Sequence, residues 1–398
     1  MHTLLLWTLL AQGVSDDAIV IGMEKSVQSF SADEENLGMR LVIKHVNAGG
    51  GIHGRMLVEH GYARTRENYV QKQVANVKRM VEEDGVFLLF NFGGPASMQI
   101  GPYAMKHGVP YMFPHTALLT VDGKREIFTS YPRYDGETRV ILEYLAEDLG
   151  AGRIGVIYAN NAYGQYFASR AKLFSDVFGY NLVGLETLAR DAADAAPQVH
   201  ALKRAHADAI IMAVYPAGAR KIVEAKAALD YDVRLVSSGP LTDEQYFAIE
   251  GGYAEGTTGF CHYPDPNVSN EPGIVRYREL MATHFPGHPV NRYSLYGYVM
   301  GSLVVEGLER AGRDLTRESF LDAMESIRDW DSGGIMPPVS FSPTDHHAQT
   351  AGFICVLEDG RFKALSDWIE PGPPPPLPPP EPELTTPSTE PIAPEPDQ

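Results

Sequence analysis

Cysteine is nearly absent from this chain of 398 residues, which holds only Cys261 and Cys355. Two cysteines cannot build a disulfide framework, and neither belongs to a C-x-x-C pair, so zinc-ribbon and thioredoxin chemistry have no support. Both lie in apolar, strand-like runs, where we expect small buried side chains. A single bridge between them stays open as the alternative.

Positive charge is also scarce, because 33 Lys and Arg residues face 51 Asp and Glu residues. The net charge of -18 argues against nucleic acid as a partner, since phosphate binding requires clustered cations. Five of the acids and no base lie in residues 371–398, a segment with 13 prolines. Such a segment cannot form a core and is typical of a disordered polyproline II tail.

Long hydrophobic runs are lacking as well, and the apolar run at Leu4–Leu10 is too short to span a bilayer. Residues 1–15 are similar to a secretory signal peptide, with small residues at Ala11 and Gly13, the two positions that a signal peptidase reads. The start of this segment has His2 but no Lys or Arg. We expect export to the periplasm, and the absent basic residue keeps a cytoplasmic protein as the alternative.

The common catalytic motifs are absent too, since no G-x-S-x-G, H-E-x-x-H or Walker string occurs. Gly49, Gly51 and Gly54 do spell G-x-G-x-x-G, but a dinucleotide-binding loop needs a strand before its glycines and a helix after them. Here Glu34–Val46 predicts a helix and Arg55–His60 predicts a strand. The glycines therefore predict a turn that leaves a helix. We expect no cofactor, no metal and no enzymatic activity.

Strand-like and helical segments alternate along most of the chain. Apolar runs such as Ile19–Met23, Val86–Phe90 and Ile154–Tyr158 are each followed by a helical pattern. Repeated βα units imply parallel sheets covered by helices on both faces. We predict an α/β fold in two lobes, with residues 18–131 and 263–340 in one and residues 132–262 and 341–370 in the other.

Nine short segments, taken in order, resemble the periplasmic solute-binding proteins of branched-chain amino-acid ABC transporters, the leucine/isoleucine/valine-binding type. They include Ile19–Gly22, the helix end and turn at His45–Arg55, Arg153–Tyr158 and Tyr215-Pro216. The resemblance covers about residues 18–370. It implies a type I periplasmic-binding-protein fold, a ligand cleft between the lobes, and an ABC permease as the partner.

The resemblance also implies where the ligand binds. In the family, a serine and a threonine on two successive loops hold the ligand carboxylate, and here Gly94, Ser97 and Thr116 stand near those positions. Tyr163 and Tyr215 match the family's cleft tyrosines. The full set of candidate ligand-binding residues is Gly94, Ser97, His115, Thr116, Tyr134, Asn161, Tyr163, Tyr215 and Gly239.

One expected group is missing from the sequence. The carboxylate that pairs with the ligand ammonium should fall within Ser237–Pro240, but the first acid after this segment is Asp243. Burying an ammonium without a counter-charge would cost several kcal/mol. We therefore expect an amide, aromatic or apolar ligand, which suits the aromatic residues on the strand-to-helix loops: Phe30, Phe92, Phe113, Tyr134, Tyr163 and Tyr215.

These observations lead to a functional hypothesis. We expect an extracytoplasmic receptor that closes two lobes on a small organic ligand and delivers it to an ABC permease, its only contact with the membrane. A cytoplasmic, amide-sensing regulator of the same fold is the alternative. An enzyme on this scaffold is a third possibility, without a supporting motif.

Overall fold

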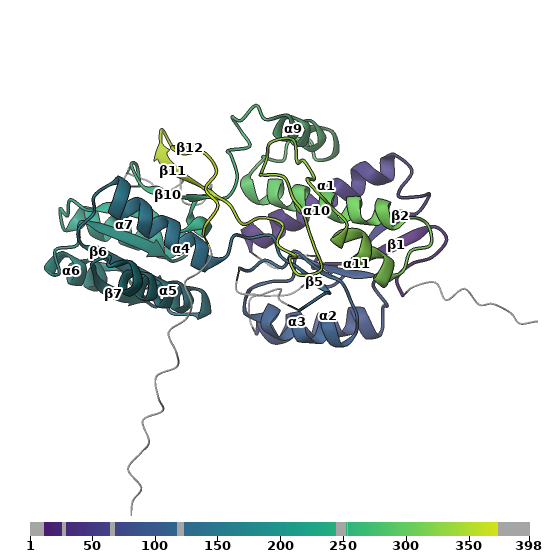
Figure 1. The fold of residues 1–398 in the computed structure, drawn as a ribbon, viewed down its shortest axis with the longest axis horizontal. Coiled ribbons are helices and arrows are strands. Elements are labelled where there is room, and N and C mark those ends of the chain that lie inside the picture. The colour runs from purple at the N-terminus through teal and green to yellow at the C-terminus, as the bar shows by residue number, and fades with distance from the viewer. Residues whose placement is uncertain are drawn as a thin grey trace, which may run out of the picture.

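The computed structural model describes residues 12–25, 29–63, 68–117, 123–243, 252 and 254–372. Most of the signal-like segment and the proline-rich tail beyond residue 372 lie outside these ranges. Figure 1 shows two lobes, one built on strands β1 to β5 and the other on strands β6 to β12. The predicted two-lobed α/β fold is confirmed.

The first lobe contains a sheet of parallel strands in the order β2-β1-β3-β4-β5. Ile19 and Ile21 of β1 face the core under α1, α9, α10 and α11, whereas Val20 faces α2 and α3 on the opposite side. This alternation matches the twofold period of a strand. The elements are β1 (Ala18–Gly22), α1 (Phe30–Ala48), β2 (Met56–His60), α2 (Tyr69–Glu82), β3 (Leu88–Phe90), η1 (Gly94–Ala96), α3 (Ser97–Lys106), β4 (Tyr111–Met112), β5 (Ile127–Phe128), α9 (Pro272–His284), α10 (Arg292–Ala311) and α11 (Arg317–Glu325).

The second lobe contains a sheet in the order β12-β11-β10-β9-β8-β6-β7. Its strands are parallel except for β11, which runs antiparallel to both β10 and β12. Helices α4 and α5 cover one face, and α6 and α7 cover the other. The elements are α4 (Tyr134–Glu143), the π-helix η2 (Tyr144–Asp148), β6 (Ile154–Ala159), α5 (Ala162–Phe178), β7 (Leu182–Leu188), α6 (Ala196–Arg204), β8 (Ala209–Ala213), α7 (Pro216–Ala228), β9 (Arg234–Ser237), η3 (Gly239–Leu241), β10 (Thr258–Cys261), β11 (Phe353–Glu358) and β12 (Arg361–Ala364).

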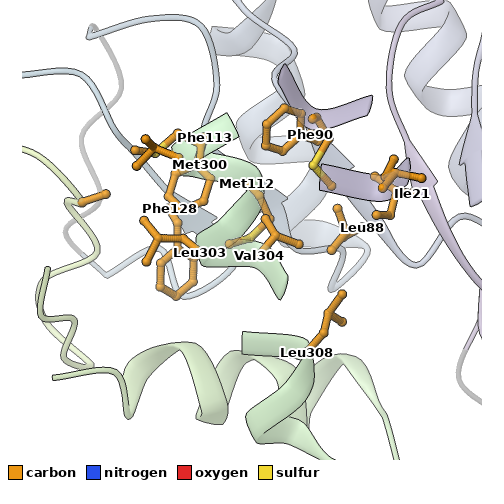
Figure 2. Close-up of a cluster of buried hydrophobic side chains, with 14 of the residues drawn as sticks. Ile21, Leu88, Phe90, Met112, Phe113, Phe128, Met300, Leu303, Val304 and Leu308 are labelled. Carbon is orange, nitrogen blue, oxygen red and sulfur yellow. The ribbon is translucent and has the colours of Figure 1, made fainter. Parts of the chain in front are cut away.

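Helices α1 and α10 pack against each other with their backbones in contact. A Cβ atom at Gly38 would lie 2.2 Å from the carbonyl oxygen of Ser294, and one at Gly297 would lie 1.9 Å from that of Glu35. Only glycine permits this approach. Figure 2 shows the apolar side chains that α10 places beside the sheet, among them Met300, Leu303, Val304 and Leu308.

The chain crosses between the lobes at residues 129–133, 262–271 and 346–352. The first and third crossings are hydrogen-bonded, because the Thr129 N–H donates to His346 O at 3.0 Å and the Ala348 N–H donates to Thr129 O at 2.8 Å. The second and third crossings are linked by Gln349, whose side-chain amide donates to His262 O at 2.6 Å. The three crossings therefore form one connected junction.

Cys261 of β10 and Cys355 of β11 form a disulfide, with their Cα atoms 6.0 Å apart. Both residues are fully buried, as expected, and the single bridge that the sequence leaves open is formed. The antiparallel pairing of β10 with β11 brings together two residues separated by 94 positions, which local sequence does not reveal. Among the described helices, none is long and apolar enough to cross a membrane.

The glycine turn behaves as predicted. Helix α1 ends at Ala48, β2 begins at Met56, and the turn between them holds Gly50, Gly51 and Gly54 at φ values of 97°, 77° and 82°. These are left-handed conformations that favour glycine. The string leads out of a helix into a strand and is not a phosphate-binding loop.

Candidate functional site

The candidate site lies where the loops after the parallel strands of both lobes meet. In open α/β sheets, ligands bind at this edge. Tyr134 of the second lobe shares a hydrogen bond with the backbone of Ala117 in the first. At another point of the interface, the Tyr293 hydroxyl of α10 donates to the Asp243 carboxylate after η3. We call the region between these two contacts the interlobe site.

The first lobe contributes polar groups that are largely bonded to one another. The Gly94 N–H donates to His115 O at 3.1 Å, and the Thr116 N–H donates to Pro114 O at 2.6 Å. The buried Ser97 hydroxyl donates to Gly94 O at 2.6 Å. Hydrogen bonds within the lobe therefore engage the Gly94 and Thr116 backbone N–H groups and the Ser97 hydroxyl.

A buried carboxylate fixes His115 in this lobe. Glu35 of α1 is completely buried, and both of its oxygens lie 2.7 Å from His115 Nδ1. The Tyr131 hydroxyl also donates to Glu35 Oε1, and the Tyr131 ring stacks on Tyr296 at 4.7 Å. Burial raises the pKa of Tyr131, and the neighbouring Glu35 charge raises it further, so this phenol stays a donor.

The second lobe contributes a layer of tyrosines. The ring of Tyr163 lies 4.8 Å from that of Tyr134 and 5.6 Å from that of Tyr215. Asn161 caps α5 by accepting the Gly164 N–H at 3.1 Å, and it also hydrogen-bonds Tyr215. Tyr215 remains 48% exposed, so the layer has an open edge.

A second buried carboxylate lies beside this layer. Glu137 of α4 is completely buried, and its Oε1 accepts the Gly239 N–H at 2.8 Å. Its Oε2 lies 3.5 Å from His262 Nε2, beyond hydrogen-bonding distance. Burial raises the pKa of Tyr163, and the charge of Glu137 raises it further, which places this carboxylate within electrostatic reach of the layer.

Two parts of the sequence interpretation need correction. Phe92 and Phe113 are fully buried in the cores of the first lobe and do not line the interlobe site. The argument that no acid lies near Ser237–Pro240 was also wrong, because Glu137 reaches Gly239 from another helix. Phe30 is 41% exposed and contacts Tyr293 at a ring distance of 6.0 Å.

Sequence reasoning missed Glu35, Glu137 and His262. The sequence does contain a signal for the two acids. Buried residues follow each acid three and four positions later on the same helix, such as Val140 and Ile141 for Glu137. An acid on the apolar stripe of a helix must find a partner or lose its charge. His262 follows a strand and carried no comparable signal.

A metal centre finds no support in the described part of the chain, where no group of three or more His, Cys, Asp or Glu side chains is placed to hold an ion. What the arrangement offers is an aromatic layer, a histidine on a buried carboxylate, and a second carboxylate at a backbone turn. Such groups suit the capture of a small organic molecule between two surfaces.

Known proteins share this architecture. The Leu/Ile/Val-binding protein homolog 7 of Brucella abortus is 25% identical over 301 residues, which cover 70% of this chain and 73% of that protein. A fatty acid ABC transporter substrate-binding protein from Thermomonospora curvata superposes with a TM-score of 0.77 at 20% identity, covering 90% of this chain and 94% of that one.

A branched-chain amino-acid ABC transporter protein from Thermus thermophilus, with bound valine, also superposes with a TM-score of 0.77, at 15% identity and with coverage of 89% and 97%. At such identities these two structures establish the fold alone. The family model described as "Periplasmic binding protein" matches residues 20–361, which is most of the chain. The chain therefore belongs to the periplasmic binding protein family and has its two-lobed type I fold.

Proposed function

We propose that this protein is an exported solute receptor that binds a small organic ligand in the interlobe site and delivers it to an ABC permease. The observation that carries the proposal is the meeting of two dissimilar surfaces, the tyrosine layer of the second lobe and the polar loops of the first. The candidate contacts are Gly94, Ser97, His115, Thr116, Tyr134, Asn161, Tyr163, Tyr215 and Gly239, with Glu137 added.

Closure of the lobes would provide the binding energy. Each lobe presents a partial site, and a ligand between them stabilises the closed arrangement only through contacts that the open one lacks. The crossings at 129–133, 262–271 and 346–352 would bend to permit this movement. Binding of this kind requires no chemical step, and the proposal is that the protein is not an enzyme.

The disulfide favours export over the cytoplasmic, amide-sensing alternative. Disulfides such as Cys261–Cys355 persist in oxidising compartments and are rare in the cytoplasm. Cell fractionation tests this point directly. Full-length protein retained in the cytoplasm with both thiols reduced would contradict export.

The ligand class is the next question. The Thermus thermophilus structure holds valine, while the Thermomonospora curvata protein is named for fatty acids, so proteins of this fold serve chemically different ligands. A thermal-shift screen over amino acids, amides, aromatic acids and fatty acids tests binding, because a ligand at a hundred times its Kd stabilises the folded state by about 2.7 kcal/mol. No shift with any class would contradict the receptor proposal.

A further inference from the structure

The described chain ends in a segment that lies across the junction between the lobes. After β12, Trp368 packs against the cores of both lobes. Ile369 then pairs with Gly352 of the third crossing, because its N–H donates to Gly352 O at 2.6 Å and its carbonyl accepts the Gly352 N–H at 3.2 Å. The segment is therefore held at the junction before it reaches α4.

The last two described residues lie on helix α4. A Cβ atom at Gly136 would lie 2.8 Å from the Pro371 ring, so the missing side chain leaves room for this proline. A Cβ atom at Gly372 would lie 2.6 Å from Nη1 of Arg139, on the same helix. Both residues line a cavity of about 140 Å³, whose wall also includes Phe174 of α5. The chain is thus already packed against the second lobe where the proline-rich segment begins.

An exposed apolar surface continues from this point at the end of α5. The Arg139 guanidinium lies over the Phe178 ring at 5.1 Å. Phe178 also lies 6.2 Å from the Phe174 ring and 6.0 Å from the Tyr180 ring. Phe178 is 40% exposed and Val177 is 50% exposed, and apolar side chains gathered at a surface are typical of a binding site. We call Phe174, Val177, Phe178 and Tyr180 the aromatic strip.

The sequence that follows Gly372 has the composition that such a strip binds. Residues 373–380 contain seven prolines and one leucine. Proline-rich segments form an extended polyproline II helix, and grooves lined by aromatic side chains recognise this shape. Prolines offer carbonyl acceptors without N–H groups, which suits an arginine such as Arg139. The helix rises about 3.1 Å per residue, so about three residues cover the width of the guanidinium that separates Gly372 from the Phe178 ring.

From this continuity we propose that residues 373–380 dock on the aromatic strip of the second lobe. Pro371 is then the first of a run of prolines seated against α4 and the end of α5, and Arg139 donates to their carbonyls. The docked run holds residues 366–372 in place across the junction. The partner of this surface is thus a segment of the same chain, and the proposal does not depend on which ligand the interlobe site binds.

Footprinting with hydroxyl radicals measures whether the strip is covered. The full-length protein is compared with a full-length variant in which each of the seven prolines of residues 373–380 is changed to serine, which keeps the length of the tail but weakens its preference for polyproline II. A tethered segment acts at a millimolar effective concentration, so we expect oxidation of Phe178 to rise at least about threefold in the variant. Met56 of β2, in the first lobe, is similarly exposed at 41% and should be oxidised equally in both proteins.

A variant of the strip tests the same contact from the other side. A spin label on Glu381→Cys, directly after the proline run, reports the mobility of the tail by electron paramagnetic resonance. The label attaches selectively because both native cysteines are in a disulfide. Phe178→Ala should make the label at least about twofold more mobile, since it weakens the intramolecular contact. Met56→Ala is the matched control and should leave the mobility unchanged.

The outcomes separate this proposal from other uses of the surface. Equal oxidation of Phe178 in the wild-type protein and the serine variant would overturn it, and so would a label whose mobility does not respond to Phe178→Ala. Protection of Phe178 that persists in the serine variant and increases with protein concentration would assign the strip to a second copy of the chain. None of these results bears on the proposed receptor function, which the ligand screen tests separately.

Discussion

The two lobes share an architecture but handle their polar groups differently. In the first lobe, Ser97, Glu35 and His115 are bonded within the lobe. In the second lobe, Glu137 and His262 face each other with unsatisfied atoms. A ligand that supplied a hydrogen-bond partner to Glu137 Oε2 or His262 Nε2 would gain more from these atoms than from the Ser97, Glu35 and His115 groups, which are already bonded.

The lobes also differ in how they are held together. The first relies on a glycine contact between two helices, at Gly38 and Gly297, and contains no cysteine. The second has a covalent bond between β10 and β11. One lobe therefore depends on close packing and the other adds a cross-link, and the two should respond differently to mutation.

The largest effect should come from Gly297→Ala. The added methyl group would lie 1.9 Å from Glu35 O, so α1 and α10 must separate, and we expect a loss of about 3 kcal/mol or more in unfolding free energy. Urea unfolding measures it. Gly152→Ala in the second lobe is the control, because its nearest contact would be an ordinary 3.6 Å. Equal stability of the two variants would refute the dependence on close packing.

Removal of the disulfide should have the next largest effect. The double variant Cys261→Ala/Cys355→Ala opens a loop of 94 residues, and we expect a loss of about 2–4 kcal/mol. Reduction of the wild-type protein should lower its unfolding free energy by a similar amount and its thermal midpoint accordingly. An unchanged midpoint after reduction, with free thiols verified, would show that the bond contributes nothing to stability.

A pH-dependent contribution is expected where the second crossing meets β12. Burial would raise the pKa of Asp265, but Arg292 and hydrogen bonds from Asn267 and Arg361 outweigh it and hold this pKa below its usual value. The stabilisation is therefore present above the unfolded-state pKa of about 3.9 and is lost as the pH falls through the folded-state value. Asp265→Asn should cost about 1–2 kcal/mol at pH 7 and almost nothing in strong acid. A pH-independent difference in unfolding free energy would contradict this account.

The smallest effect should be that of Ser97→Ala. Its hydroxyl already bonds Gly94 O, so we expect a loss of about 1 kcal/mol in stability and the smallest loss of ligand affinity among the candidate contacts. Tyr215→Ala, at the open edge of the second lobe, should instead weaken binding about tenfold. Calorimetry with a compound from the ligand screen compares the ligand affinities of the two variants. The reverse order of affinities would place the main ligand contacts in the first lobe.

The fold could be predicted from the sequence because its signals are local. Apolar runs such as Ile154–Tyr158 alternate with helical patterns, and the crossover rule then determines the parallel sheets. The disulfide was left open, since its formation depends on how β10 pairs with β11.

The site was harder to predict because, like the disulfide, it depends on contacts between segments that are far apart in the sequence. Tyr163 and Tyr215 follow strands of one sheet, so their proximity could be anticipated. Glu137 could not be placed, because it lies on a helix about 100 residues before Gly239 and reaches it only through the packing of α4 on the sheet. A family pattern read position by position looks for a charge in one loop and overlooks the same charge supplied from elsewhere.

The cross-link has a mechanical consequence as well. The second crossing leaves β10 directly after Cys261, and the third enters β11 shortly before Cys355. Two of the three crossings between the lobes therefore begin at a pair of strands, β10 and β11, that the disulfide prevents from sliding or separating. The second-lobe ends of these two crossings therefore keep a fixed spacing during any displacement of the lobes.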